Sequence, residues 1–388
     1  MKKPPLQKML TDLIATPSVS CTSADLDMSN RDVIDLLAGW LEEVGFSIEI
    51  KAVPDHPGKF NLIGTLGKGT GGLILSGHTD TVPYDDRRWT HDPFHLTEDN
   101  NRLYGLGSAD MKSFLALAIE AATQFDKEQF QHPLIVLATA DEETAMSGAR
   151  ALSAADLEHG RYAVIGEPTG LRPIRQHKGV MMEAIILQGQ SGHSSNPELG
   201  NNALEGMQAV MVELLSFRKE LQQRHHDPAF AIPVPTMNLG HIHGGDNPNR
   251  ICGECELHLD LRPLPGMQID TLRRELHQRV ESIAKPLGLG CEFKPLFAGI
   301  DAMQTKATSP IVTATESLTG FASDSVAFGT EGPYLNKLGI ETVILGPGSI
   351  DQAHQPDEFL PLDQVKPTIE ILRQLISKFC IGSQSSPL

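Results

Sequence analysis

Short apolar runs separated by amphipathic stretches constrain this chain more than any other feature. The run from Pro133 to Ala140 reads PLIVLATA, which is the length of a strand and has no alternating polar face. From Met111 to Phe125 the large apolar residues instead recur at intervals of three and four, as in a helix buried along one face. Apolar strands that alternate with such helices are typical of a sheet covered on both faces. The sequence therefore predicts an α/β fold with a central mixed sheet flanked by helices.

A different pattern occupies residues 178–296. Its periodicities predict, in chain order, a strand, a helix, two strands, a helix and a strand, over residues 180–188, 203–217, 236–243, 251–261, 269–284 and 291–295. This order is typical of a ferredoxin-like α+β sandwich. We expect a discontinuous α/β domain formed by residues 1–177 and 297–388, with residues 178–296 inserted as a second domain.

Length, charge and composition narrow the class of protein. The 388 residues exceed one typical domain, and the formal net charge of −17 argues against nucleic acid, since binding to phosphates requires excess Lys and Arg. No run approaches the length of a membrane span, and the first residues lack the apolar core of a signal peptide. Five scattered cysteines do not suggest a disulfide framework. We expect a cytoplasmic protein without a membrane anchor.

Ligand-type residues follow several of the expected strands. The stretch from Leu73 to Pro83, LILSGHTDTVP, places His78 at a strand end and Asp80 two residues later. Residues i and i+2 of an extended segment point the same way, so the carboxylate of Asp80 can orient the imidazole of His78 for metal binding. A polar loop after a buried strand is the alternative interpretation of this stretch taken alone.

The same arrangement recurs at three other strand ends. The run that ends at Ala140 is followed by Glu142 and Glu143, a short apolar run ends in Glu167, and the strand expected at residues 342–345 leads to His354. Asp110 precedes the expected helix, where a role as N-cap is the alternative. Adjacent side chains diverge, so Glu143 can bind a metal while Glu142 faces a water molecule.

Five of these residues have a joint explanation: His78, Asp110, Glu143, Glu167 and His354. Open α/β sheets place their sites at the carboxyl ends of strands. Two imidazoles and three carboxylates suit a pair of divalent ions such as Zn²⁺, with one carboxylate bridging them. Five unrelated loops are a less economical explanation than one metal centre.

Longer motifs resemble a known family. The stretches GHTDTVP, GLGSADMKS, ATADEETAMSGA, GEPT and SGHSS are similar to those of the di-zinc aminoacylase and exopeptidase family, over nearly the whole chain. Two further stretches, HIHGGDNPNRICGECELHLDLRPLPG and LGPGSIDQAHQPDEFLPL, resemble the branch that deacetylates N2-acetyl-L-ornithine in arginine biosynthesis. Hydrolysis of another N-acyl amino acid, such as succinyl-diaminopimelate, is the alternative within the family, as is a broad aminoacylase.

The resemblance implies roles for the matching residues. His78 and Glu167 would bind one ion, Glu143 and His354 the other, and Asp110 would bridge the two. Zn²⁺ is the expected ion, and Co²⁺ can substitute for it.

Two more acids have implied roles beside these ligands. Asp80 would support His78, and Glu142 would be the general base that takes a proton from the attacking water and passes it to the leaving amine. A metal-binding protein without activity is the alternative from another class. The presence of Glu142 argues against it, because metal binding alone requires Glu143 and not its neighbour.

The inserted domain would contribute the remaining residues. In the resembling family it serves as a lid and dimerises, so that its histidine, here His193, reaches the active site of the partner subunit and stabilises the oxyanion. Asn249 and Arg262 match positions that bind the substrate carboxylate. The commoner pattern of the family is Asn-x-x-Pro, but here the stretch from Asn249 to Cys252 reads NRIC, so Arg250 can share or take over that role. We therefore expect a homodimer.

Substrate choice is expected to involve Glu331. The desuccinylase of this family has an arginine in the corresponding region, where a cation suits a second substrate carboxylate. Here the stretch from Phe328 to Gly332 offers the carboxylate of Glu331, which suits the terminal ammonium of ornithine.

Overall fold

The computed structural model describes residues 3–381, which form two compact units. The first unit comprises Met1–Arg175, Thr305–Asp324 and Glu331–Leu388, and the second comprises Gln176–Gln304 and Ser325–Thr330. Each unit has its own hydrophobic core.

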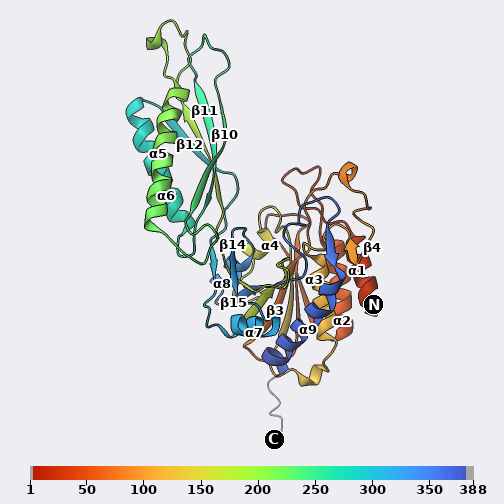
Figure 1. Ribbon diagram of the computed structural model, residues 1–388. Helices are drawn as coiled ribbons and strands as arrows, with labels where there is room; N and C mark the ends of the chain where they lie inside the picture. The colour runs from red at the N-terminus through yellow and green to blue at the C-terminus, as the bar shows by residue number, and fades with distance from the viewer. Residues whose placement is uncertain (1–2, 382–388) are drawn as a thin grey trace. The chain divides into compact units, whose positions relative to one another are not determined.

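A mixed sheet forms the centre of the first unit (Figure 1). Its strands follow the order β1 (Ser47–Ala52), β2 (Phe60–Leu66), β6 (Leu134–Thr139), β3 (Gly72–His78), β7 (Gly160–Ile165), β15 (Glu341–Ile344) and β8 (Ile174–His177). Strands β13 (Met303–Gln304) and β14 (Asp324–Val326) pair with β8, and the bounds of the second unit include β13 and parts of β8 and β14. Strands β6, β3, β7 and β15 run parallel to one another, whereas β1, β2 and β8 are antiparallel to their neighbours. The predicted mixed sheet is confirmed.

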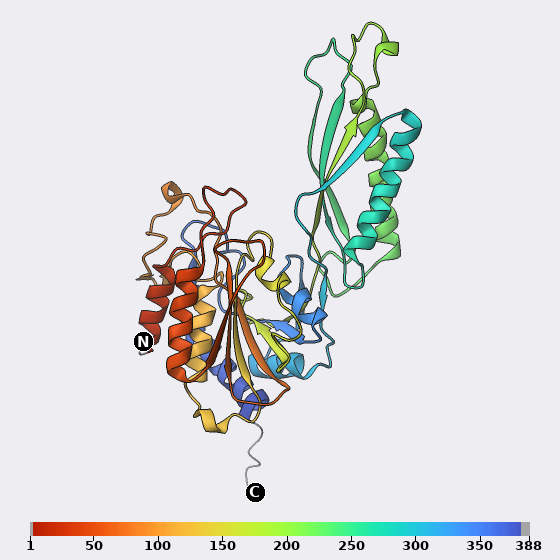
Figure 2. The same ribbon diagram turned by 180° about the vertical axis from the view of Figure 1, so that it is seen from behind.

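Helices cover this sheet. One layer consists of α1 (Leu6–Ile14), α2 (Arg31–Val44), α3 (Lys112–Ala122) and α9 (Leu362–Ile376), which lie together beside the sheet in both views (Figures 1 and 2). The remaining helices of the unit are α4 (Ser147–Arg150), α7 (Pro310–Thr319) and α8 (Gly332–Lys337). Helix α2 ends before Gly45, which adopts φ 98° in the left-handed region that favours glycine as a C-cap.

Both faces of the parallel strands are buried. Leu73 and Leu75 pack in the main core, and Ile74, which points to the opposite face, is equally inaccessible to solvent. Full burial of such a side chain contributes about 1.5–3 kcal/mol, so a strand that is apolar throughout is stable only between two covering layers. This is why the strands read as continuous apolar runs.

Helix α3 is buried more completely than the sequence predicts. The spacing of its apolar residues predicts one buried face, but only Glu120 within α3 is even partly accessible. The sheet lies against one side of α3, and α1 and α9 pack against its other sides. Neighbouring helices thus cover the surface that would otherwise face solvent.

Smaller elements complete the first unit. A three-stranded sheet has the order β16 (Phe359–Pro361), β5 (Arg102–Tyr104) and β4 (Thr97–Asp99). Short helical turns in the two units are η1 (Asp86–Arg88), η2 (Lys127–Gln129), η3 (Pro197–Leu199), η4 (Lys285–Leu287) and η5 (Ser377–Ile381). Within residues 3–381, no helix is both long enough and apolar enough to cross a membrane.

The second unit, coloured green to cyan in Figure 1, has the predicted β-α-β-β-α-β order. Its elements are β9 (Met181–Gln188), α5 (Ala203–Arg224), β10 (Thr236–Gly244), β11 (Glu254–Arg262), α6 (Ile269–Ala284) and β12 (Gly290–Pro295). The antiparallel sheet has the order β10-β11-β9-β12, and α5 and α6 pack against each other and against its strands. Helix α5 extends beyond the predicted residue 217 because Leu221 still packs into the core. The α+β sandwich is confirmed.

Candidate metal centre

Parallel strand ends gather the candidate ligands at one edge of the sheet. His78 at the end of β3 pairs with Thr139 at the end of β6, Ser76 pairs with Ile165 at the end of β7, and Ile165 pairs with Ile344 at the end of β15. Because these strands end within two residues of one another in register, the loops that follow them start at the same edge. His78 is the last residue of β3, Glu143, Glu167 and His354 lie on the loops after β6, β7 and β15, and Asp110 lies between β5 and α3.

His78 is held in one orientation by main-chain and side-chain contacts. Its Nδ1 lies 2.9 Å from the carbonyl oxygen of Asp80, which can only accept, so Nδ1 carries a proton and Nε2 faces the cluster. Nε2 lies 3.0 Å from Oδ1 of Asp110. The carboxylate of Asp80 is farther from Nδ1, at 3.6 Å, and accepts hydrogen bonds from the main-chain N–H groups of Glu142 (3.2 Å) and Glu143 (3.1 Å). Asp80 thus holds the next ligand loop, while its carbonyl orients His78.

Asp110 is not a helix cap. It precedes Met111, the N-cap residue of α3, and no side chain caps this helix. The two carboxylate oxygens of Asp110 face different imidazoles: Oδ1 lies 3.0 Å from His78 Nε2, and Oδ2 lies 3.5 Å from His354 Nε2. The peptide bond between Asp110 and Met111 is cis. A carboxylate in this position can bridge two ions.

The other predicted ligands complete the cluster. Nε2 of His354 lies 2.9 Å from Oε2 of Glu143, and Oε1 of Glu167 lies 4.0 Å from His78 Nε2. His354 adopts φ 60°, and its side chain is 52% exposed, whereas those of Glu143 and Glu167 are buried. The cluster is therefore closed on the side of the sheet and open beside His354.

Electrostatics make this cluster unfavourable without a further positive charge. Burial and then the charge of Asp110 raise the pKa of Glu143 to about 7, and the same causes raise the pKa of Glu167 well above its ordinary value. Hydrogen bonds to Asp110 and Glu143 raise the pKa of His354 to about 10. Burial lowers the pKa of His78, but the hydrogen bond to Asp110 and the nearby carboxylates outweigh it and raise that pKa well above its ordinary value.

This donor set fits divalent cations. Donor atoms of His78, Asp110 and Glu143 lie within 4.8 Å of one another, and His354 and Glu167 stand beside them. Imidazole and carboxylate are the ligands of zinc and similar ions, and bound cations relieve the repulsion among buried carboxylates. The cluster therefore supplies side chains of the kinds that bind divalent cations.

Two further acids lie close to the cluster. Burial and then the charges of Glu167 and Glu143 raise the pKa of half-buried Glu142 well above its ordinary value. Glu331, just before α8, is buried, and its Oε2 accepts a hydrogen bond of 2.9 Å from the hydroxyl of Thr139. Burial raises the pKa of Glu331 to about 7, and no hydrogen-bond partner within residues 3–381 reaches its Oε1.

The second unit brings the predicted catalytic His193 together with Asn249 and Arg250, two of the predicted substrate-binding residues. His193 forms an antiparallel bridge with Arg250, and the N–H of Ser194 donates to the carbonyl of Asn249 at 3.0 Å. Nδ1 of the exposed His193 accepts a hydrogen bond of 3.2 Å from the N–H of Ser195, so in the neutral ring the proton lies on Nε2. These residues, which are more than fifty positions apart in the sequence, form one exposed loop cluster.

Both candidate arginines have acidic partners in their own unit. Arg250 pairs with Asp246 at 2.5 Å and is exposed, and Nε of Arg262 lies 3.0 Å from the carboxylate of Asp260. A substrate carboxylate would compete with these aspartates. The bulge in β10 lies beside this region, between Leu239 and His241.

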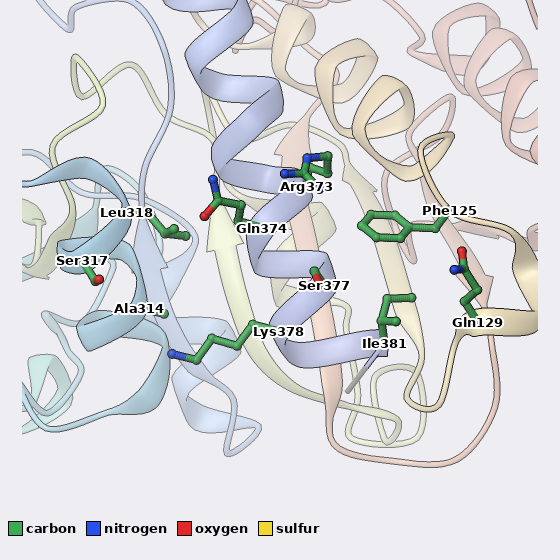
Figure 3. A pocket seen from close by; sticks show the side chains of 10 residues that line it. All are labelled: Phe125, Gln129, Ala314, Ser317, Leu318, Arg373, Gln374, Ser377, Lys378 and Ile381. Carbon is green, nitrogen blue, oxygen red and sulfur yellow. The ribbon is translucent and has the colours of Figure 1, made fainter. Parts of the chain in front are cut away.

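A hollow elsewhere in the first unit has different chemistry. It has a volume of about 1050 Å³ and is bordered by α7, α9 and the segment after α3 (Figure 3). Arg373 and Lys378 are its charged lining residues among those that the structure describes, and none of the described lining residues is a histidine or an acid. It therefore lacks the ligands found at the strand ends.

Comparison with known proteins identifies the family of this chain. Residues 74–378 match the model of "Peptidase family M20/M25/M40", which covers most of the chain. This chain belongs to the M20/M25/M40 peptidase family. Acetylornithine deacetylase of Proteus mirabilis is 49% identical over 385 residues, covering 99% of both chains, and that of Pectobacterium carotovorum is 49% identical over 380 residues, covering 98% of this chain and 99% of the relative.

Solved structures share the fold of this M20/M25/M40 member. A tripeptidase from Staphylococcus aureus gives a TM-score of 0.74 at 19% identity, with 96% of each chain covered. A dinuclear metal-binding peptidase of the M20 family from Bacillus subtilis gives 0.66 at 16% identity, with 95% of this chain and 96% of that chain covered. The resemblance found in the motifs is thus confirmed, and the chain is a metal-dependent hydrolase of this family.

One acid of this family member was missed by sequence reasoning. Glu358 is buried, and its carboxylate accepts three main-chain hydrogen bonds from the loop that carries Asp110. It lies four residues after His354, in a stretch that resembles the family, but no local periodicity marks it. Only the contacts in the folded chain identify it.

Proposed function

We propose that this chain removes the acetyl group from N2-acetyl-L-ornithine, giving L-ornithine and acetate. The observation that carries the chemistry is the meeting of five ligand-type side chains with Glu142 at one sheet edge. The near full-length identity to relatives named acetylornithine deacetylase supports the substrate. We also propose a place in arginine biosynthesis and a cytoplasmic location, with which five unpaired cysteines are compatible.

The proposed ligands divide between two ions. His78 and Glu167 would bind one, His354 and Glu143 the other, and Asp110 would bridge them, as the separate contacts of its two oxygens support. Zn²⁺ suits the mixture of imidazole and carboxylate, and Co²⁺ could replace it. When bound, such ions polarise a carbonyl group and lower the pKa of water.

Glu142 is the proposed general base. Its main-chain N–H is held by the carboxylate of Asp80, so its side chain starts from a fixed position in the loop. Burial and the neighbouring charges of Glu167 and Glu143 raise the pKa of its side chain. A carboxylate with a raised pKa can take a proton from the attacking water and then donate it to the leaving amine.

The second unit is the proposed lid and dimerisation domain. His193 can donate from Nε2 to the oxyanion of the partner subunit's reaction, because its Nδ1 is an acceptor for Ser195. Arg250 lies beside it and, with Asn249 and Arg262, is a candidate for binding the substrate carboxylate. A homodimer would then be required for full activity.

Glu331 is the proposed contact for the terminal ammonium of ornithine. Its Oε1 is buried without a hydrogen-bond partner among the described residues, which is costly unless a donor reaches it. Glu331→Gln should reduce turnover of acetylornithine far more than that of acetylmethionine, whose side chain carries no charge. Equal losses for the two substrates would refute this role.

The decisive experiment measures ornithine release by the purified chain, with and without Zn²⁺ or Co²⁺. Succinyl-diaminopimelate and acetylmethionine are the competing substrates. We expect metal-dependent turnover that favours acetylornithine and is abolished in Glu142→Ala while the metal content stays unchanged. A preference for another substrate would favour the alternative, a different N-acyl amino acid hydrolase, and no hydrolysis by the metal-loaded chain would refute the proposed activity.

A further inference from the structure

Glu358 binds the main chain of the loop that carries Asp110. Its Oε1 accepts hydrogen bonds from the N–H groups of Ala109 (2.7 Å) and Asp110 (2.9 Å), and its Oε2 accepts one from Gly107 (3.1 Å). The carbonyl oxygen of Glu358 accepts a fourth, from the N–H of Gly105 at 3.0 Å. With 1% of its surface exposed, the residue makes these contacts away from solvent. Buried polar groups whose hydrogen bonds are all made hold the segments that they join in one arrangement.

These contacts join two ligand loops. Glu358 lies on the same loop as His354, and it binds the loop of Asp110, whose carboxylate contacts both His354 and His78. A shift of the Asp110 main chain would therefore move its two oxygens relative to both imidazoles. The position of Asp110 relative to the imidazoles of His78 and His354 thus depends on the hydrogen bonds that the buried carboxylate of Glu358 accepts.

The loop has little freedom to find another arrangement. Gly107 adopts φ 81°, in the left-handed region, and a Cβ there would lie 2.8 Å from atoms of both Lys112 and Thr81. Three N–H groups of this loop donate to the two carboxylate oxygens of Glu358. Asp80 makes the corresponding contact for the loop of the proposed general base, with two N–H groups.

We propose that Glu358 is a positioning residue for the metal centre: it holds Asp110 where each carboxylate oxygen faces a different ion. This inference rests on the metal centre proposed above. It assigns Glu358 no contact with substrate. Residues that orient metal ligands typically change metal affinity or activity by about 10–100-fold when replaced.

The test is Glu358→Gln, which keeps the size of the side chain but turns an NH₂ group toward main-chain donors. Metal dissociation constants, measured by competition with a chelating dye, should rise about 10–100-fold for the more weakly held ion. Turnover should fall at limiting metal and recover in part at saturating metal, with KM for substrate unchanged. Thermal unfolding of the metal-free variant, compared with that of the metal-free unaltered protein, measures how much the substitution lowers the stability of the fold.

A matched control separates positioning from the general cost of neutralising a buried acid. Glu183 in the second unit is also fully buried and accepts hydrogen bonds of 3.0 Å from Arg273 and His277. Glu183→Gln should lower stability and leave the metal dissociation constants unchanged. If Glu358→Gln fails to fold, Glu358→Asp serves, because its shorter carboxylate keeps the charge but cannot reach all three donors, and it should show an intermediate loss of metal affinity.

The outcomes are distinguishable. Unchanged metal affinity in a folded Glu358 variant, or an equal loss in Glu183→Gln, would overturn the positioning role. Failure of the unaltered chain to bind two ions would instead overturn the proposed metal centre. Weakened binding confined to the Glu358 variants would support both.

Discussion

Replacing Gly166 by alanine tests how tightly the chain before a ligand is packed. Gly166 follows β7 and immediately precedes Glu167. A Cβ at this position would lie 2.0 Å from Cγ of Phe114 and 2.2 Å from its Cδ2. Carbon atoms in contact are normally separated by about 3.5–4.0 Å, so the added methyl group would overlap the ring by about 1.5 Å or more.

The expected cost follows from this overlap. Overpacking a core usually costs about 1–3 kcal/mol, and because Phe114 is buried between the sheet and its neighbouring helices, we expect Gly166→Ala to lie at the upper end, about 3 kcal/mol. Urea unfolding followed by circular dichroism measures the loss. Gly240→Ala is the control, since its nearest atom is the end of the Asn238 side chain at 3.3 Å, and it should stay within about 0.5 kcal/mol of the unaltered protein.

A second substitution identifies the contact responsible. Phe114→Ala alone should lower stability because it leaves a cavity, yet in the Gly166→Ala background it should restore part of the loss, because it removes the ring atoms that the new methyl group overlaps. Such a reversal corresponds to a coupling energy of about 0.5–3 kcal/mol in a double-mutant cycle. Additive losses, or a stability of Gly166→Ala within about 0.5 kcal/mol of the unaltered protein, would refute the packing argument.

Three further predictions concern other sites. Asp80→Asn should lower kcat or metal affinity about 10–100-fold, measured by turnover and metal content. The reason is that one of the two side-chain oxygens that accept hydrogen bonds from main-chain N–H groups is replaced by an NH₂ donor; unchanged values would contradict the proposed support of the ligand loop by Asp80. Burial opposes the charge of Asp357, but hydrogen bonds from the main chain and from Thr90 lower its pKa to about 2. These hydrogen bonds therefore stabilise the folded protein fully above a pH of about 4, and this contribution is lost as the pH falls toward about 2. Asp357→Asn should therefore narrow the difference in thermal stability between pH 6 and pH 3. An unchanged difference would show that ionised Asp357 does not contribute to the stability of the folded chain. Burial raises the pKa of Cys380 to about 12 and that of Cys255 to about 11, so both thiols should react with a thiol reagent at pH 8 only after unfolding; rapid labelling of the folded chain would show that they are accessible.

Much of the fold could be predicted because local patterns decide it. Helix α6 has the predicted bounds, Ile269–Ala284. The apolar run from Pro133 predicted a strand buried on both faces, and β6 is fully buried. Periodicity did not determine the surroundings of α3, because the burial of a helix depends on which other helices pack against it.

The candidate site could be predicted in part. His78, Glu143, Glu167 and His354 follow parallel strands, and the structure brings them together because such strands end at the same edge of a sheet. For Asp110 the sequence left two interpretations open, a helix cap or a ligand, and its contacts with two imidazoles favour the second. Both interpretations use the same residue type in the same place, so only the direction of the side chain separates them.

The sequence by itself determined the fold class, the elements and the residue types that meet at the sheet edge, because hydrophobic periodicity and motif spacing are local properties. Tertiary structure alone decided which acid holds which loop. Asp80 accepts hydrogen bonds from a loop more than sixty residues away, and Glu358 accepts them from one about 250 residues away. Main-chain N–H groups are present at every residue except proline and leave no mark in the sequence, so their acceptors become visible only once the chain has folded.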